Sequence, residues 1–121
     1  MKAKQDLPYL QHILEVIEVV EDYIRDKSWE EFRCDRRTQD SVIRQITIIG
    51  EACNQISPSL QQAHPTIPWS SIIGMRHKLV HDYFRVDLVV VWQTAQNRLP
   101  PLKAQIQHLI QHLIEELDET S

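Results

Sequence analysis

The sequence predicts an all-α protein, an antiparallel bundle of four main helices. Apolar residues recur every three or four positions over long stretches, and no stretch alternates in the manner of a β-strand. Only two glycines occur among 121 residues, and 42% of the residues are hydrophobic. This length is sufficient for one core but not for two. We therefore expect a single helical domain over residues 1–121.

The first helix is expected to begin at Asp6-Leu7-Pro8 and to end near Asp26. Aspartate is a favourable N-cap, and proline is tolerated in the first turn, where its missing N–H is not needed. A stripe of apolar residues at helical spacing should face the core: Leu7, Leu10, Ile13, Leu14, Ile17, Val20 and Ile24.

Residues 27–33 are interpreted as a connector whose Trp29 and Phe32 cover one end of the bundle. The second helix should run from about residue 35 to residue 56. Its apolar positions alternate four and three apart, as in the seam of an antiparallel bundle: Val42, Ile46, Ile49, Cys53 and Ile56. Gly50 weakens a helix interior, so we expect it to permit a close approach of another helix.

A proline-containing segment, residues 57–68, should separate the second helix from the third. Ser70 or Ser71 is expected to cap the third helix, and the helix should end near Tyr83 or Phe84.

The fourth helix is expected to follow Asp87 and to be long and bent at Pro100-Pro101. Prolines remove backbone hydrogen bonds and kink a helix. The apolar spacing nevertheless continues through them, which indicates that both halves face one partner surface: Leu88, Trp92, Ala95, Leu99, Leu102, Ile106, Leu109 and Leu113.

Charge and composition limit the possible partners. The net charge of −4 argues against broad, salt-dependent nucleic-acid binding, and no DNA partner is expected. Residues 71–98 are the exception, with four Lys or Arg against two acids. No membrane-spanning run or signal peptide is recognised, and Cys34 and Cys53 lack paired spacing, so a cytoplasmic protein with reduced thiols is expected.

Residues 74–84 combine an apolar helical arc with chemically active side chains. Arg76 falls inside this arc, and His77 and His81 lie at its polar border. Arg76 could be a structural arginine paired with Glu51, because a buried guanidinium requires a partner. However, a fixed cation, a histidine that titrates near neutral pH and the phenol of Tyr83 together could handle a phosphodiester without a metal.

The pattern Arg76, four residues, His81, one residue, Tyr83 resembles the Arg-x4-His-x-Tyr signature of HepT-like toxins. These are HEPN-superfamily ribonucleases encoded beside minimal nucleotidyltransferase antitoxins, in systems of the HepT–MntA type. His77 departs from the family, whose members often carry Asn there. The likeness covers most of the chain: Asp6-Leu7-Pro8-Tyr9, Ile48-Ile49-Gly50-Glu51-Ala52, His64-Pro65, Ile67-Pro68-Trp69, Gly74-Met75-Arg76, Leu79-Val80-His81-Asp82-Tyr83-Phe84 and Trp92.

The resemblance implies a metal-independent endoribonuclease that uses no cofactor and leaves 2′,3′-cyclic phosphate ends. Arg76 and His81 would be catalytic, with His77 and Glu51 in support, and Tyr83 would accept AMP from the cognate nucleotidyltransferase antitoxin. Arg76 and His81 project about 140° apart on an ideal helix. The homodimer of the family, with its motifs facing a shared cleft, would resolve this if the helix bends or two chains contribute.

Two alternatives remain open at the level of sequence. The first is a metal-binding bundle, because His77 and His81 form one i, i+4 pair and His108 and His112 form another. The second is a non-catalytic helical module that binds a nucleotide or a protein, since binding an anion and cleaving one use the same residues. The sequence does not identify the RNA substrate, nor whether His81 is the general base or the general acid.

Overall fold

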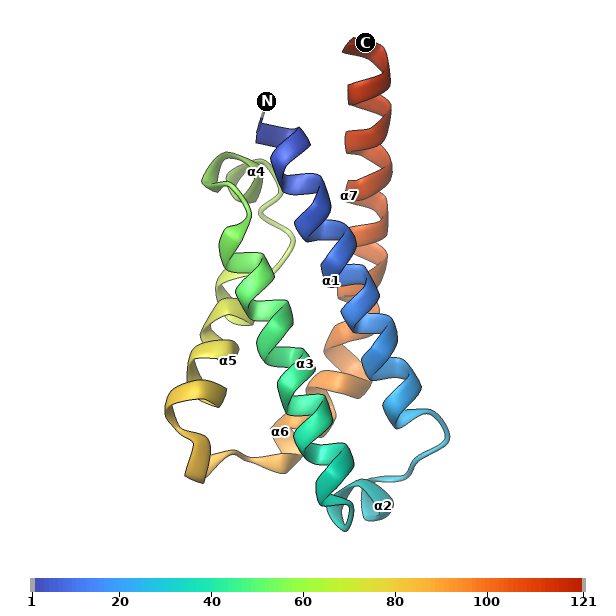
Figure 1. Cartoon of the computed structure of the whole chain (residues 1–121), viewed down its shortest axis with the longest axis vertical. Helices are drawn as coiled ribbons and strands as arrows, with labels where there is room; N and C mark the ends of the chain where they lie inside the picture. Colours follow the sequence, from blue (N-terminus) through green and yellow to red (C-terminus); the bar gives the residue numbers. More distant parts are fainter. Residues whose placement is uncertain (1, 121) are drawn as a thin grey trace.

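The structure, a computed structural model, describes residues 2–120, apart from the side chains of residues 2, 3, 83 and 120. This part of the chain contains helices but no β-strand, which confirms the predicted all-α bundle. The elements are α1 (Lys2–Ile24), α2 (Trp29–Arg33), α3 (Arg36–Gln55), α4 (Pro58–Ala63), α5 (Trp69–His81), the 3-10 turn η1 (Tyr83–Arg85), α6 (Leu88–Gln93), the π-helical η2 (Thr94–Arg98) and α7 (Leu99–Thr120) (Figure 1).

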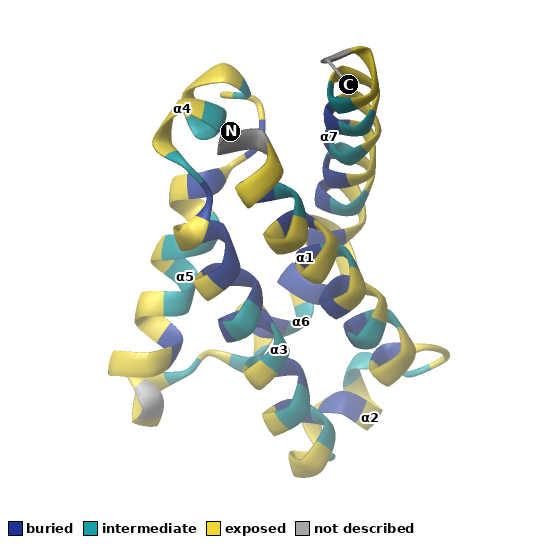
Figure 2. Ribbon diagram, turned by 45° about the horizontal axis from the view of Figure 1, so that its top comes forward, coloured by how far each residue is buried: buried dark blue, intermediate teal, exposed yellow. Residues whose placement is uncertain are grey.

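The long helix α3 lies at the centre, between α1 and α5, and α7 packs against α1 (Figure 1). Figure 2 shows buried residues concentrated on the faces where these helices meet. The fully buried side chains come from the predicted apolar stripes and include Leu10, Ile13, Ile17, Val42, Ile49, Ile106, Leu109 and Leu113. Helix α5 is therefore an edge element, packed on α3 along one side and more exposed along the other.

The start of α1 differs from the sequence prediction. The helix begins at Lys2, so Pro8 lies inside it and Asp6 does not cap it. Asp6 is instead buried, and its carboxylate accepts hydrogen bonds from the backbone N–H and the hydroxyl of Ser57, at 2.8 and 2.6 Å. The carboxylate was assigned to the wrong helix end, because its partner lies 51 residues away at the start of α4.

The predicted connector contains the short helix α2. Ser28 and Glu31 form a capping box, in which each side chain accepts a hydrogen bond from the backbone N–H of the other residue, both at 3.1 Å. The predicted packing role of the aromatic residues is confirmed, because Phe32 is fully buried and its ring centroid lies 5.0 Å from that of Trp92.

Both predicted ends of the third helix were wrong by a few residues. Helix α5 begins at Trp69, after Pro68 in the N-cap position, and it ends at His81. Ser70 and Ser71 therefore lie inside the first turn, and no side chain caps the start of α5. At the other end, Asp82 donates its N–H to the carbonyl of Lys78 and the chain continues as the turn η1.

The predicted fourth helix is interrupted by η2, just before Pro100 and Pro101. In η2 the backbone hydrogen bonding widens by one residue, and the N–H of Leu99 reaches the carbonyl of Thr94. A proline at position 100 has no N–H to donate and would crowd the carbonyl four residues earlier, and a π-type turn relieves this conflict. Figure 1 shows the chain changing direction between α6 and α7, so the predicted bend is present but lies in η2, just before Pro100-Pro101 rather than at the prolines.

Candidate active site

Arg76 projects from α5 onto α3 at Gly50. A β-carbon added to Gly50 would overlap Cβ of Arg76 and would lie 2.9 Å from its Cγ and 3.2 Å from the carbonyl oxygen of Ile72. Only glycine leaves room for the arginine at this crossing. The close approach predicted from Gly50 is confirmed, and it is the base of the Arg76 side chain that fills the space.

The guanidinium of Arg76 is only partly engaged by the described residues. Its Nη2 lies 3.7 Å from Oε1 of Glu51, an ion-pair distance that is too long for a hydrogen bond. Its Nε is buried and has no hydrogen-bond partner among the side chains and backbone that the structure describes. The side chain is 32% exposed. The planar fork of N–H donors that the guanidinium forms is therefore held in place and is still accessible from solvent.

A pocket of about 400 Å³, lined mostly by polar residues, has Arg76 in its wall. It lies between α1 and α3, with Arg76 contributed by α5. Tyr9 and His12 line it from α1, and the α3 side includes Glu51, Asn54 and Gln55 together with Ile48 and Ala52. The sequence reasoning did not connect Tyr9 or His12 with Arg76, because only the packing of α1 against α3 brings them together.

His77 and His81 lie on an exposed part of the same helix. Their ring centroids are 4.3 Å apart with the planes tilted by 45°, so the two imidazoles contact each other. Both residues are exposed, and neither lines the pocket that contains Arg76. His81 is the last residue of α5.

The structure therefore brings Arg76 and Glu51 together and His77 and His81 together, as two separate groups. Helix α5 continues regularly through both groups up to His81, so the angular separation of about 140° between Arg76 and His81 is not removed by a bend within the motif. One copy of the chain does not direct the arginine and the terminal histidine at one point.

Tyr83 begins the turn η1 immediately beyond α5. Its side chain lies outside the described part of the structure, so the direction of its hydroxyl is not assigned. The backbone nevertheless places it two residues after His81, at the exposed end of the motif helix.

Apolar residues are exposed around this end of the molecule. Val80 is 44% exposed on α5, Phe84 is 96% exposed on η1, and Val90 is 45% exposed on α6. Within the predicted apolar arc, Leu79 is buried at 7% exposure, whereas Val80 and Phe84 remain exposed. The arc is therefore only partly covered. Exposed apolar side chains close in sequence to the motif are compatible with an association surface.

A second, open groove lies between α3 and η1. It has a volume of about 700 Å³, and its lining includes Arg36, Arg44 and Phe84. Arg36 is also 3.6 Å from Asp40, within an exposed ion pair. Two arginines and an exposed ring are groups that bind the backbone and the bases of a single strand.

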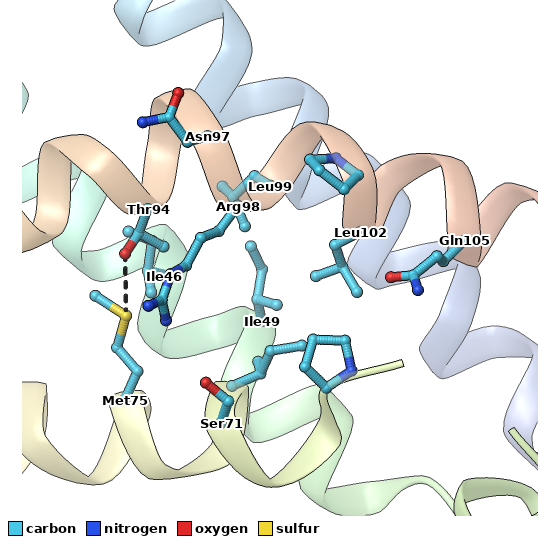
Figure 3. A pocket seen from close by; sticks show the side chains of 13 residues that line it. Ile46, Ile49, Ser71, Met75, Thr94, Asn97, Arg98, Leu99, Leu102 and Gln105 are labelled. Carbon is cyan, nitrogen blue, oxygen red and sulfur yellow. Dashed lines mark hydrogen bonds between the residues drawn. The ribbon is translucent and has the colours of Figure 1, made fainter. Parts of the chain in front are cut away.

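The largely apolar cavity in Figure 3 lies on another side of α5, between α3, η2 and α7. It has a volume of about 410 Å³, and Ile46, Ile49 and Leu102 contribute to its lining. The hydroxyl of Thr94 donates to the sulfur of Met75 at 3.4 Å across it (Figure 3). This contact ties the π-helical segment to the motif helix.

The second histidine pair of the sequence, His108 and His112, does not belong to a larger set of metal-binding side chains among the described residues. His112 lies 3.1 Å from Glu116, and its ring is 6.3 Å from that of His64. Within residues 2–120, where side chains are described, no group of three or more His, Cys, Asp or Glu is arranged to hold a metal ion. In the same part of the chain, no helix has the length and hydropathy needed to cross a bilayer.

Comparison with known proteins identifies related sequences. Residues 13–109 match the model of a family described as Ribonuclease HepT-like. A Thermococcus cleftensis protein named "Probable ribonuclease HepT" is 44% identical over 101 residues, which cover 84% of this chain and 92% of that protein.

Two further relatives carry similar names. A Caldanaerobacter subterraneus protein named "Putative RNase" is 34% identical over 108 residues, or 89% of this chain and 96% of that protein. A Methanocaldococcus jannaschii protein named "Gamma-glutamylcyclotransferase and putative RNase" is 39% identical over 105 residues, which cover 87% of this chain but only 47% of that longer protein. No solved structure matches the chain closely enough to count as a relative.

Proposed function

Because the chain belongs to the HepT-like ribonuclease family, we propose that it is a metal-independent endoribonuclease and the toxin of a toxin–antitoxin system. The observation that carries the proposal is Arg76. Its guanidinium is fixed against Gly50, yet its buried Nε has no hydrogen-bond partner in the described structure and Glu51 is beyond hydrogen-bond distance. Such a fork is suited to an incoming phosphate, which accepts two parallel N–H donors.

In the proposed reaction, Arg76 holds the scissile phosphate of RNA. The 2′-hydroxyl of the preceding ribose attacks phosphorus, the bond to the 5′-oxygen breaks, and a 2′,3′-cyclic phosphate forms. Negative charge develops on the phosphate oxygens in the transition state, where a preorganised guanidinium stabilises it more than it stabilises the ground state. Glu51 keeps the guanidinium oriented in the free enzyme.

His81 would handle the protons, either by accepting one from the 2′-hydroxyl or by donating one to the leaving 5′-oxygen. Both roles require an imidazole within hydrogen-bond reach of the substrate. Its exposed position and its contact with the ring of His77 leave it accessible to a bound strand. His77 would support the orientation of His81.

We propose that the complete site forms between two copies of the chain. The two groups of motif residues are separate within one copy, and the exposed Val80 and Phe84 lie beside them. A two-fold dimer that covers this face would bring Arg76 of one copy towards His81 of the other. Light scattering should then give the mass of a dimer at micromolar concentration, and the mass of one chain would count against this arrangement.

Regulation is proposed to act through Tyr83. A cognate nucleotidyltransferase antitoxin would transfer AMP from ATP to the phenol, so that the tyrosine oxygen bonds to the α-phosphorus and pyrophosphate leaves. The adduct would place a negative charge and a nucleoside two residues from His81 in the sequence. Competition of that phosphate with RNA for the arginine would silence the enzyme in the cytoplasm.

The function is tested with purified protein and single-stranded RNA. Cleavage should continue in EDTA and should leave 2′,3′-cyclic phosphate ends, which mass spectrometry identifies. Loss of cleavage in EDTA with rescue by zinc would replace this proposal with the metal-binding alternative.

The regulation is tested separately. Tyr83→Phe should retain ribonuclease activity but escape AMP addition and neutralisation by the co-expressed nucleotidyltransferase. Continued modification of that variant would exclude Tyr83 as the acceptor.

A further inference from the structure

The pocket that Arg76 lines is also lined by residues to which the proposed reaction assigns no role. Its volume of about 400 Å³ falls within the range of about 300–1,000 Å³ that is usual for small-ligand sites. Tyr9 is 40% exposed and the side chain of Glu51 is 51% exposed, so the pocket opens to solvent. A planar group of modest size could enter it from outside.

Two residues with rings line the pocket from α1, and two residues with amides line it from α3. Tyr9 and His12 are three residues apart and therefore neighbours on the surface of α1. Asn54 and Gln55 line the pocket from α3, and each carries an amide with both donors and an acceptor. Rings that stack on a base and amides that bond to its polar edge are the side chains by which proteins recognise unstacked bases.

The position of Arg76 links this pocket to the reacting phosphate. Arg76 forms part of the pocket wall, and the buried Nε lacking a described partner belongs to the same side chain. A phosphate bound at the fork would therefore have a nucleoside directly at the pocket entrance. We infer that the pocket seats one unstacked nucleobase of single-stranded RNA, next to the phosphate bound by Arg76, with Tyr9 as the stacking residue. This inference rests on the proposed ribonuclease function and adds a base-binding subsite to it.

The test measures coupling between one residue and one nucleotide. The probe is a single-stranded oligoribonucleotide that the enzyme cuts at one mapped position, made uncleavable by a 2′-deoxyribose there. A series of such probes carries an abasic site at each successive position. Affinity is measured by fluorescence anisotropy for wild type, Tyr9→Leu, Tyr9→Phe and Tyr23→Leu. Tyr23 is the matched control, because it is also an exposed tyrosine of α1, at 37%, and lies roughly 21 Å further along the helix.

For the wild type, one abasic position next to the scissile phosphate should weaken binding by about tenfold, the usual effect of losing a stacked base. The same abasic position should have no effect on Tyr9→Leu, which has already lost the stacking ring, whereas Tyr9→Phe and Tyr23→Leu should retain the penalty. Circular dichroism melting confirms that each variant is folded.

Two results would overturn the inference. A full abasic penalty in Tyr9→Leu would place the sensitive base elsewhere, and binding that is equally tolerant of every abasic position in wild type would exclude a base subsite. Both results leave the ribonuclease function intact if the cleavable RNA is still cut. Failure to cut any RNA would instead reject the proposed function, while the affinities would still report on the pocket.

Discussion

The two groups of motif residues on α5 occupy very different surroundings. Arg76 is packed against the backbone of α3 at Gly50 and lies in a pocket formed by three helices. His77 and His81 contact each other on an exposed surface, close in sequence to the exposed Val80 and Phe84. One group is therefore positioned by the fold of a single chain, whereas the other is at the edge of the bundle.

This difference separates the phosphate-binding part of the proposed reaction from the proton-transfer part. The arginine is preorganised, which is what electrostatic stabilisation of a transition state requires. The histidines lack comparable packing within one chain, so a second copy or the substrate has to fix their positions. This comparison predicts that a substitution at the contact between Arg76 and Gly50 disturbs the arginine within its own chain. The effect of substituting a histidine should instead depend on the association of two chains.

The largest effects are expected at the two residues proposed to be catalytic. Arg76→Ala and His81→Ala should each lower RNA cleavage by at least about 100-fold, because each removes either charge stabilisation or proton transfer. Arg76→Lys should also fail, since an ammonium does not reproduce the two-pronged fork. Cleavage rates on a defined RNA, with circular dichroism as the control for folding, measure these effects. Activity within tenfold of wild type would remove that residue from the mechanism.

A large effect is also expected at Gly50, which has no catalytic group. In Gly50→Ala the new methyl group would overlap Arg76 and would make a tight contact with the carbonyl oxygen of Ile72, and overpacking of this kind destabilises a protein by about 1–3 kcal/mol. Displacement of the arginine should also lower cleavage. Urea unfolding and cleavage rates measure the two losses.

Gly74→Ala is the matched control for this prediction. Gly74 lies in α5, two residues before Arg76, and an added β-carbon there meets no atom within 4 Å. Alanine should stabilise the helix by up to about 1 kcal/mol and leave Arg76 in place. If both alanine variants behaved alike, the packing of Arg76 on Gly50 would not be what positions it.

The smallest effect concerns the two thiols, which report on the packed and exposed surroundings directly. Burial raises the pKa of Cys53 on α3 to about 12, whereas Cys34 is exposed. At pH 8 a thiol reagent should label Cys34 rapidly in the folded protein, and it should label both cysteines in urea.

Because the pKa of Cys53 is raised on folding, the stability associated with its neutral thiol is present below the pKa of an unfolded cysteine and declines as pH rises towards about 12. Rapid labelling of both thiols at pH 8 would contradict the packed core.

The sequence was sufficient to predict the main helices and much of the core, because their apolar spacing is long and regular. It also predicted the close approach at Gly50, because glycine destabilises a helix interior and its presence there indicates a packing requirement. It assigned Asp6 to the wrong helix end, because the carboxylate binds Ser57 across the fold. The Ser28 and Glu31 capping box was readable from local spacing and was overlooked.

The site was less predictable than the fold. Local spacing identified the motif residues and placed Arg76 and His81 about 140° apart on one helix. It could not show that Arg76 packs on Gly50 while His81 lies exposed. Nor could it associate Tyr9 with Arg76, because these residues are 67 positions apart and meet only in a pocket between helices. Features that depend on how helices are packed require the structure.

The most direct test of the proposed two-chain site is cleavage by purified heterodimers, in which the two copies carry different affinity tags. An Arg76→Ala copy paired with a His81→Ala copy retains one intact site if arginine and histidine come from different chains, so about half of the wild-type activity should remain. A wild-type copy paired with the double variant Arg76→Ala/His81→Ala should then be inactive, because each site lacks one group. The reverse result, an inactive first heterodimer and a half-active second, would show that both groups act within one chain and would contradict the account.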